Sequence, residues 1–111
     1  MEPKKSDLKI AQQVSREFKN KLGNRLVSVF LYGSRARGKA RRDSDIDLFL
    51  LRKKRPKFGG REEDIITETT VKYLNSNNLY VSAIPYGIKD YQKNKNYVPV
   101  LYWIDKEGIE L

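Results

Sequence analysis

The stretch YGSRARGKARRDSDIDLFL, from Tyr32 to Leu50, lies between two apolar segments and concentrates a Gly-Ser pair, five basic residues and three aspartates. The segment before it, RLVSVFLY, is rich in β-branched and aromatic residues and predicts a buried strand over residues 26–32. Gly33 and Ser34 interrupt that pattern, and DIDLFLLR predicts a second strand. The connection is therefore either a solvated charged loop or a binding site.

The two aspartates at the start of the second strand favour a binding site. A strand places alternate side chains on opposite faces, so Asp45 and Asp47 share one face with Phe49 and Leu51. The opposite face carries Ile46, Leu48 and Leu50. Two carboxylates this close repel each other, and a cation between them relieves the repulsion.

The Gly-Ser pair favours a phosphate ligand. A glycine at the end of a strand lets a ligand approach the backbone closely, and the free N–H groups and the Ser34 hydroxyl can donate hydrogen bonds to phosphate oxygens. A divalent cation on carboxylates beside such donors is the recurring apparatus of phosphoryl and nucleotidyl transfer. The basic residues of the connection can neutralise the remaining charge of a triphosphate.

The rest of the chain predicts further helices and strands in alternation. Beyond the two strands, we expect helix 7–22 ending at Gly23, a short helix after Gly33, helix 62–75, strand 79–86, helix 97–106 ending at Gly108, and a short final strand. This order predicts an α/β (α+β) fold, a small mixed β-sheet flanked by helices. With 111 residues, we expect one domain spanning residues 1–111.

Composition narrows the ligands and the location. The chain has no cysteine and no histidine, so a metal would be held by oxygen ligands, which points to Mg²⁺ or Mn²⁺. The net charge of +9 suits an anionic partner, although lysine-rich charge networks also stabilise thermophilic proteins. No segment has the apolar run of a signal peptide or a membrane span, so we expect a cytoplasmic protein without membrane contact.

The segment GSRARGKARRDSDID resembles the signature of the DNA polymerase β-type nucleotidyltransferase superfamily, in which Gly-Ser is followed after ten residues by Asp-x-Asp. The length and element order, and the ending IDKEGIEL, are similar to those of the short members, the minimal nucleotidyltransferases. Each feature is weak alone, and together they are strong because the spacing and the elements agree. The resemblance implies the nucleotidyltransferase fold.

The resemblance also implies roles for matching residues. Asp45 and Asp47 would be the catalytic and metal-binding carboxylates for Mg²⁺ or Mn²⁺. The residues that would bind ATP or another nucleoside triphosphate are Gly33 and Ser34 at the β- and γ-phosphates, with Arg35, Arg37 and Gly38 shaping or charging the phosphate pocket. Asp43 recurs in relatives as well, but an aspartate just before a strand commonly makes a turn hydrogen bond to the backbone.

One expected group is missing. The mechanism of the family uses a third carboxylate on a neighbouring strand, yet LYVSAIPYG contains neither Asp nor Glu, and Ser82 is the expected occupant of that place. Losing a general base typically costs about 10²- to 10⁴-fold in rate. The acidic residues Glu62, Glu63 and Asp64 could reach the site from the start of their helix, or could interact there only with the helix dipole.

Two functions remain open on this basis, and a third is weaker. The resemblance implies a Mg²⁺-dependent nucleotidyltransferase that moves AMP from ATP onto a hydroxyl of a HEPN-domain ribonuclease toxin, and so acts as an antitoxin in a toxin–antitoxin system. The second function is a catalytically impaired relative that binds and masks this partner. The third is a basic RNA-binding protein, which the paired carboxylates disfavour, so nucleic acid is not expected as a direct ligand.

Two surfaces are candidates for contacts with partners. The basic segment RKKRPKFGG, residues 52–60, could grip RNA or an acidic partner, or could be a solvated, mobile loop. The last helix is apolar nearly all round, which predicts a homo-oligomer or a heterocomplex through this helix. Its expected core-facing stripe is Tyr97, Val100, Leu101 and Ile104, with Val98, Tyr102 and Trp103 directed elsewhere.

Overall fold

A computed structural model describes residues 2–39, 41, 44–55 and 59–111. The helices in this part of the chain are α1 (Lys5–Leu22), the 3₁₀ turn η1 (Gly23–Arg25), α2 (Gly33–Ala36), α3 (Arg61–Asn77), α4 (Ile88–Asn94) and α5 (Pro99–Glu107). The strands are β1 (Leu26–Tyr32), β2 (Ile46–Arg52), β3 (Val81–Gly87) and β4 (Ile109–Glu110). Asp43, for which we expected a turn hydrogen bond, lies outside the described residues.

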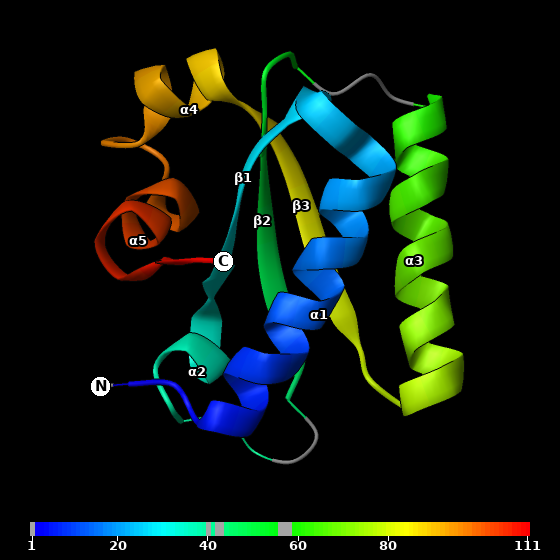
Figure 1. The fold of residues 1–111 in the computed structure, drawn as a ribbon. Coiled ribbons are helices and arrows are strands. Elements are labelled where there is room, and N and C mark those ends of the chain that lie inside the picture. Colours follow the sequence, from blue (N-terminus) through cyan, green and yellow to red (C-terminus); the bar gives the residue numbers. More distant parts are fainter. Residues whose placement is uncertain (1, 40, 42–43, 56–58) are drawn as a thin grey trace.

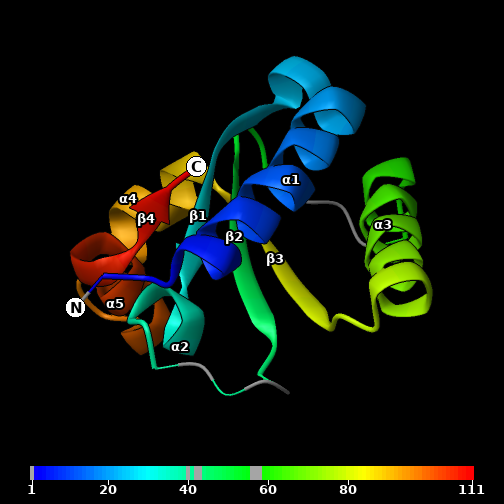
Figure 2. The same ribbon diagram turned by 60° about the horizontal axis from the view of Figure 1, so that its bottom comes forward.

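The strands form one mixed sheet in the order β3-β2-β1-β4. Strand β1 runs antiparallel to both β2 and β4, and β2 runs parallel to β3 through the crossover helix α3. Helices α1 and α3 cover one face of this sheet and helices α4 and α5 cover the other (Figures 1 and 2). The predicted mixed sheet flanked by helices is confirmed.

Strand β2 separates two apolar clusters. Ile46, Leu48 and Leu50 are fully buried in the cluster that also contains residues of α1 and α3. Phe49 and Leu51 are buried in a second cluster with residues of α5. Both faces of this central strand are covered, as the alternation predicted, so its direction and register are held firmly.

Most element boundaries fall within two residues of the expected ones. Helix α1 ends at Leu22 because Gly23 takes a φ of +62°, a backbone conformation that interrupts the helix and that residues with side chains rarely adopt. Helix α4 was not predicted, because its seven residues are too few to show a clear apolar periodicity. It is held to the sheet by Tyr91, whose ring centre lies 5.7 Å from that of Phe49.

The predicted core stripe of the last helix is half wrong. Leu101 and Ile104 are buried as expected, but Val100 is 38% exposed. Tyr97 is 82% exposed because it precedes α5, which begins only at Pro99. Val98, which precedes the helix, packs against the second cluster instead. Trp103 and Tyr102 are exposed, as expected for residues directed away from the core. Over the described residues, no helix has the length and apolar character needed to cross a membrane.

Candidate active site

The two aspartates lie where β2 begins. Asp47 is the second residue of the strand and is half-buried, and Asp45 immediately precedes the strand and is exposed. The hydrogen bond from the Ile46 N–H to the Tyr80 carbonyl, 2.9 Å long, ties this start to the neighbouring strand. The pair therefore occupies the edge of the sheet at which β1 ends and β2 and β3 begin.

The Gly33 backbone lies directly against the Asp47 carboxylate. The antiparallel register sets Tyr32 opposite Asp47, so the residue after Tyr32 leaves the sheet beside that carboxylate. A Cβ atom at Gly33 would overlap Asp47 Oδ2, and the Gly33 φ of +77° is one that residues with side chains rarely adopt. The Gly-Ser turn and the Asp45–Asp47 pair thus form one site, although ten residues separate Ser34 from Asp45.

The electrostatics of Asp47 indicate a site prepared for a cation. Burial and the neighbouring Asp45 charge raise the pKa of the Asp47 carboxyl above its usual range, and the charges of Arg37 and Arg35 oppose this only in part. Burial and the charge of Asp47 likewise raise the pKa of Tyr32 to about 12, so its hydroxyl stays protonated at neutral pH.

The carboxylate pair fits a divalent cation. Both causes that raise the pKa of Asp47, lost hydration and a like charge, are relieved when a cation binds between the two carboxylates. Among the described residues, however, no group of three or more acidic, histidine or cysteine side chains is arranged to hold a metal ion. Asp45 and Asp47 therefore supply part of a coordination shell, and substrate oxygens or water would have to complete it.

Arg35 is buried behind the aspartate pair, and its guanidinium is held by Asp7 and by the backbone just before β2. Its Nη1 pairs with Asp7 Oδ1 at 2.6 Å, and its Nε donates to the Ser44 carbonyl at 3.0 Å. This guanidinium joins α1, α2 and the segment that leads into β2. Arg35 therefore fixes how these elements meet at the site. Asp7 is a positioning residue that the sequence did not reveal, because 28 positions separate it from Arg35.

The other predicted phosphate-binding residues lie on the short helix α2 and just after it. Ser34 is half-buried in α2, and its carbonyl accepts a hydrogen bond from the Lys39 N–H at 3.0 Å. Arg37 is exposed, and its Nη1 lies 3.6 Å from Glu107 Oε2 of α5. Gly38 has φ +69°, and a Cβ there would overlap the Glu2 carbonyl. The absence of a side chain at Gly38 leaves room for the backbone of the N-terminal segment.

Strand β3 places a hydroxyl where the chemistry would use a carboxylate. In the parallel register, Ser82 lies opposite Asp47. No residue of β3, Val81–Gly87, is acidic. A serine is a weak metal ligand and no general base at neutral pH. The site holds two carboxylates side by side and a hydroxyl as their neighbour.

The acidic residues at the start of α3 do not supply the missing group. Helix α3 follows the other end of β2, and Glu62 pairs there with Arg25 and Arg52. Glu63 accepts a hydrogen bond from the Gly59 N–H. The expectation that residues 62–64 could reach the site is wrong, because the crossover helix starts at the opposite edge of the sheet.

Fold and site together define the class: a nucleotidyltransferase fold with a glycine turn held against an Asp-x-Asp strand. The family model described as a nucleotidyltransferase domain matches residues 9–107. The chain belongs to this family.

Comparison with individual proteins agrees. A candidate protein adenylyltransferase of Methanocaldococcus jannaschii is 30% identical over 82 residues, which are 70% of this chain and 56% of that protein, so the chain spans little more than half the length of this relative. A toxin–antitoxin crystal structure with AMP-PNP has a TM-score of 0.59 at 16% identity and covers 89% of this chain and 70% of its own. A candidate nucleotidyltransferase from Sulfolobus solfataricus has a TM-score of 0.54 at 23% identity, and the match covers 95% of this chain and 78% of that one. These similarities show the fold.

Proposed function

We propose that this protein transfers AMP from ATP to a hydroxyl of a protein partner, in a reaction that depends on Mg²⁺ or Mn²⁺. The contact between the Gly33 backbone and the Asp47 carboxylate carries the proposal, because it brings a phosphate-binding turn to a cation site. The similarity to a candidate protein adenylyltransferase supports AMP as the group transferred.

The residues divide the work in a simple way. Gly33 and Ser34 bind the β- and γ-phosphates, Asp45 and Asp47 hold the divalent cation, and Arg37 adds positive charge at the rim. Bound there, the cation would supply charge that favours departure of pyrophosphate. The acceptor oxygen bonds to the α-phosphorus, the bond from this phosphorus to the bridging oxygen of the β-phosphate breaks, and the hydroxyl proton passes to water.

The partner we propose is a HEPN-domain toxin, so that the protein acts as an antitoxin in the cytoplasm. Structural neighbours of this chain come from toxin–antitoxin crystal structures, one of them named MntA-HpeT. Exposed Trp103, Tyr102 and Tyr97 around α5 offer an apolar surface for a heterocomplex or for a second copy. We also propose that residues 1–111 form one domain.

The experiment measures transfer of label from ATP labelled in its α-phosphate to a HEPN protein, with Mg²⁺ present. We expect label on the partner with the native protein and none with the Asp45→Asn, Asp47→Asn double variant. The matched control is Glu63→Gln, Asp64→Asn, which removes two carboxylates at the other edge of the sheet and should leave transfer unchanged. Equal labelling by the double variant would disprove the proposal.

A second function is favoured by one observation, the Ser82 hydroxyl beside Asp47 in place of a carboxylate. Without a general base, the protein would inhibit its partner by binding alone. Complex formation without label on the partner, at any metal concentration, would support this binding function and contradict transfer.

A further inference from the structure

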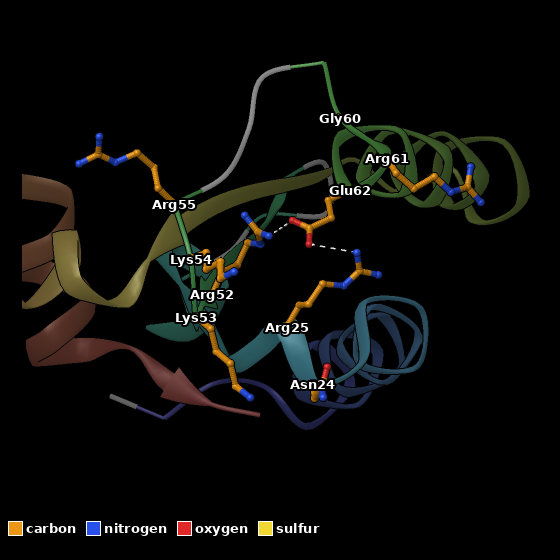
Figure 3. Close-up of a pocket in the computed structure, with 9 residues that line it drawn as sticks. All are labelled: Asn24, Arg25, Arg52, Lys53, Lys54, Arg55, Gly60, Arg61 and Glu62. Atoms are coloured by element: carbon orange, nitrogen blue, oxygen red, sulfur yellow. Dashed lines mark ion pairs between the residues drawn. The ribbon is translucent and has the colours of Figure 1, made fainter.

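A hollow with several charged residues in its lining lies at the far end of β2, away from the aspartates. It has a volume of about 380 Å³, within the range of roughly 300–1,000 Å³ common for ligand pockets. Its described lining is Asn24, Arg25, Arg52, Lys53, Lys54, Arg55, Gly60, Arg61 and Glu62 (Figure 3). Arg52 follows Asp47 by five strand residues, so about 17 Å of strand separates the two sites.

Arg52 is the inner residue of this hollow, and its hydrogen bonding is incomplete. The residue is 5% exposed, and within the described part of the chain its buried Nε and Nη1 have no hydrogen-bond partner. Among the same residues, the guanidinium is engaged through Nη2, in an ion pair with Glu62. A buried guanidinium with unsatisfied donors is costly unless an acceptor completes it. The alternative of a purely solvated loop over residues 52–60 is therefore wrong for Arg52.

The charge around Arg52 is unbalanced. Of the described lining residues, six are basic and one, Glu62, is acidic. Burial, and to a smaller extent the nearby Arg25 charge, lowers the pKa of Arg52. Figure 3 shows Arg25 and Arg52 converging on Glu62, while Lys53 and Arg61 extend outward from the rim. Arg55 also extends outward, and its charge is balanced outside the hollow by Asp90, at 2.8 Å. One carboxylate therefore serves two guanidinium groups.

The first turn of α3 combines the positive end of a helix dipole with three acidic side chains, Glu62, Glu63 and Asp64. The helix has 17 residues, and its N-cap, Gly60, has no side chain to accept a hydrogen bond from the first-turn N–H groups. The helix dipole places partial positive charge at this end. The acidic side chains offset part of this charge, so the unsatisfied donors of Arg52 are the main groups that could bind an anion with oxygen acceptors, and the first-turn amides lie beside them.

We propose that the hollow around Arg52 binds an oligophosphate group, at a site separate from that of Asp45 and Asp47. Adjacent phosphates match the several cations, and phosphate oxygens suit both the guanidinium fork and the helix amides. Free oligophosphate and a nucleic-acid backbone share this chemistry. Glu62 acts as an internal counterion that partly occupies the place of the ligand.

Binding is measured by calorimetry with inorganic tripolyphosphate in one arm and a single-stranded oligoribonucleotide in the other. Both arms contain a chelator, so that the Asp45–Asp47 site cannot contribute through a cation. We expect the Lys53→Ala, Lys54→Ala variant to bind about tenfold more weakly, because charge-assisted hydrogen bonds are lost. The matched control is Lys9→Ala, Arg16→Ala, which has the same net charge and changes exposed residues of α1.

The variant Glu62→Gln makes a sharper test because it should gain affinity. Removing the one acidic group of the described lining frees the guanidinium of Arg52 for the ligand, and we expect binding about tenfold tighter. Glu63→Gln, which removes the same charge one residue later and outside the described lining, should change affinity far less. A thermal unfolding transition checks that each variant is folded. If Glu62→Gln does not fold, the Lys53→Ala, Lys54→Ala variant decides the test.

The side-chain Nε–H resonance of Arg52 reports the contact directly, and it should shift on addition of tripolyphosphate. Binding by both probes or by tripolyphosphate alone identifies a free oligophosphate site, and binding by the oligoribonucleotide alone identifies backbone phosphate as the source. No binding by either probe, or equal weakening in the lysine pair and its control, overturns the proposal. Neither result bears on AMP transfer, since no divalent cation or acceptor is present.

Discussion

The missing side chain of Gly33 is what brings the two halves of the site together. The Asp47 carboxylate lies where a Cβ atom on residue 33 would be, and the Gly33 φ of +77° turns the chain out of β1 at that point. Ser82 then faces Asp47 from β3. At the scale of single residues, the site is defined by one absent methyl group and one hydroxyl in place of a carboxylate.

Replacing that hydroxyl tests whether the chemistry is limited by the missing base. We expect Ser82→Asp to raise the rate of AMP transfer, by up to about 10²-fold, because a third carboxylate would accept the proton of the attacking hydroxyl. The measurement is the initial rate of labelling of the partner. Ser82→Asn, of similar size and without charge, should give no increase. An equal rate for both variants would show that another group already accepts this proton.

The raised pKa of Asp47 predicts a dependence of stability on pH. A carboxyl with a raised folded-state pKa destabilises the fold when ionised, and the cost is lifted as the pH falls through that pKa. Without divalent cations, Asp47→Asn should therefore unfold at a higher temperature than the native protein at neutral pH. This difference should vanish below the ordinary aspartate pKa of 3.8.

Added Mg²⁺ should reverse that order. We expect the cation to bind the native carboxylate pair and to raise the unfolding temperature of the native protein, while Asp47→Asn should respond little. Glu68→Gln, at an exposed position of α3, is the matched control and should behave as the native protein in every condition. A native protein that is indifferent to Mg²⁺ would contradict the cation site.

At the scale of elements, one buried ion pair sets how α1, α2 and β2 meet. Arg35 and Asp7 are 9% and 7% exposed, and the guanidinium also reaches the Ser44 carbonyl just before β2. Moving any of these elements would break a bond in a place without water to replace it. The relative position of the glycine turn and the aspartate strand therefore depends on this pair.

Breaking the pair should cost far more than breaking an exposed one. We expect Asp7→Ala to lower the free energy of unfolding by about 3 kcal/mol, since it leaves a buried guanidinium uncompensated. The exposed Arg37–Glu107 pair supplies the control, and Glu107→Ala should cost at most about 1 kcal/mol. Urea denaturation measures both. Similar losses in the two variants would show that Arg35 is solvated rather than locked.

Elements with strong periodicity were predictable, and marginal ones were not. Helix α1 and strands β1 and β2 show clear apolar patterns, because one face or both faces must be buried. Helix α4 owes its place to the contact of Tyr91 with Phe49, a tertiary contact without a local pattern. Tyr97 shows the opposite case: its helical spacing from Leu101 and Ile104 predicts a core position, but the helix begins only at Pro99 and Tyr97 is exposed.

At the scale of the whole molecule, the parallel crossover separates two charged regions. Because α3 carries the chain from the end of β2 back to the start of β3, its acidic first turn meets the cations at one edge of the sheet. The carboxylate pair lies at the other edge. The net charge of +9 is therefore not spread evenly, and a phosphate ligand could meet the protein at either end.

The sequence by itself determined the alternation of helices and strands, the shared face of Asp45 and Asp47, and the absence of an acidic residue in β3. These properties follow from local spacing, since strand and helix periods act over a few residues. Only the tertiary structure decided the contact of Gly33 with Asp47, the burial of Arg35 on Asp7 and the burial of Arg52 beside Glu62 at the far edge. Each of these joins residues from different elements, and only strand register and packing bring them into contact.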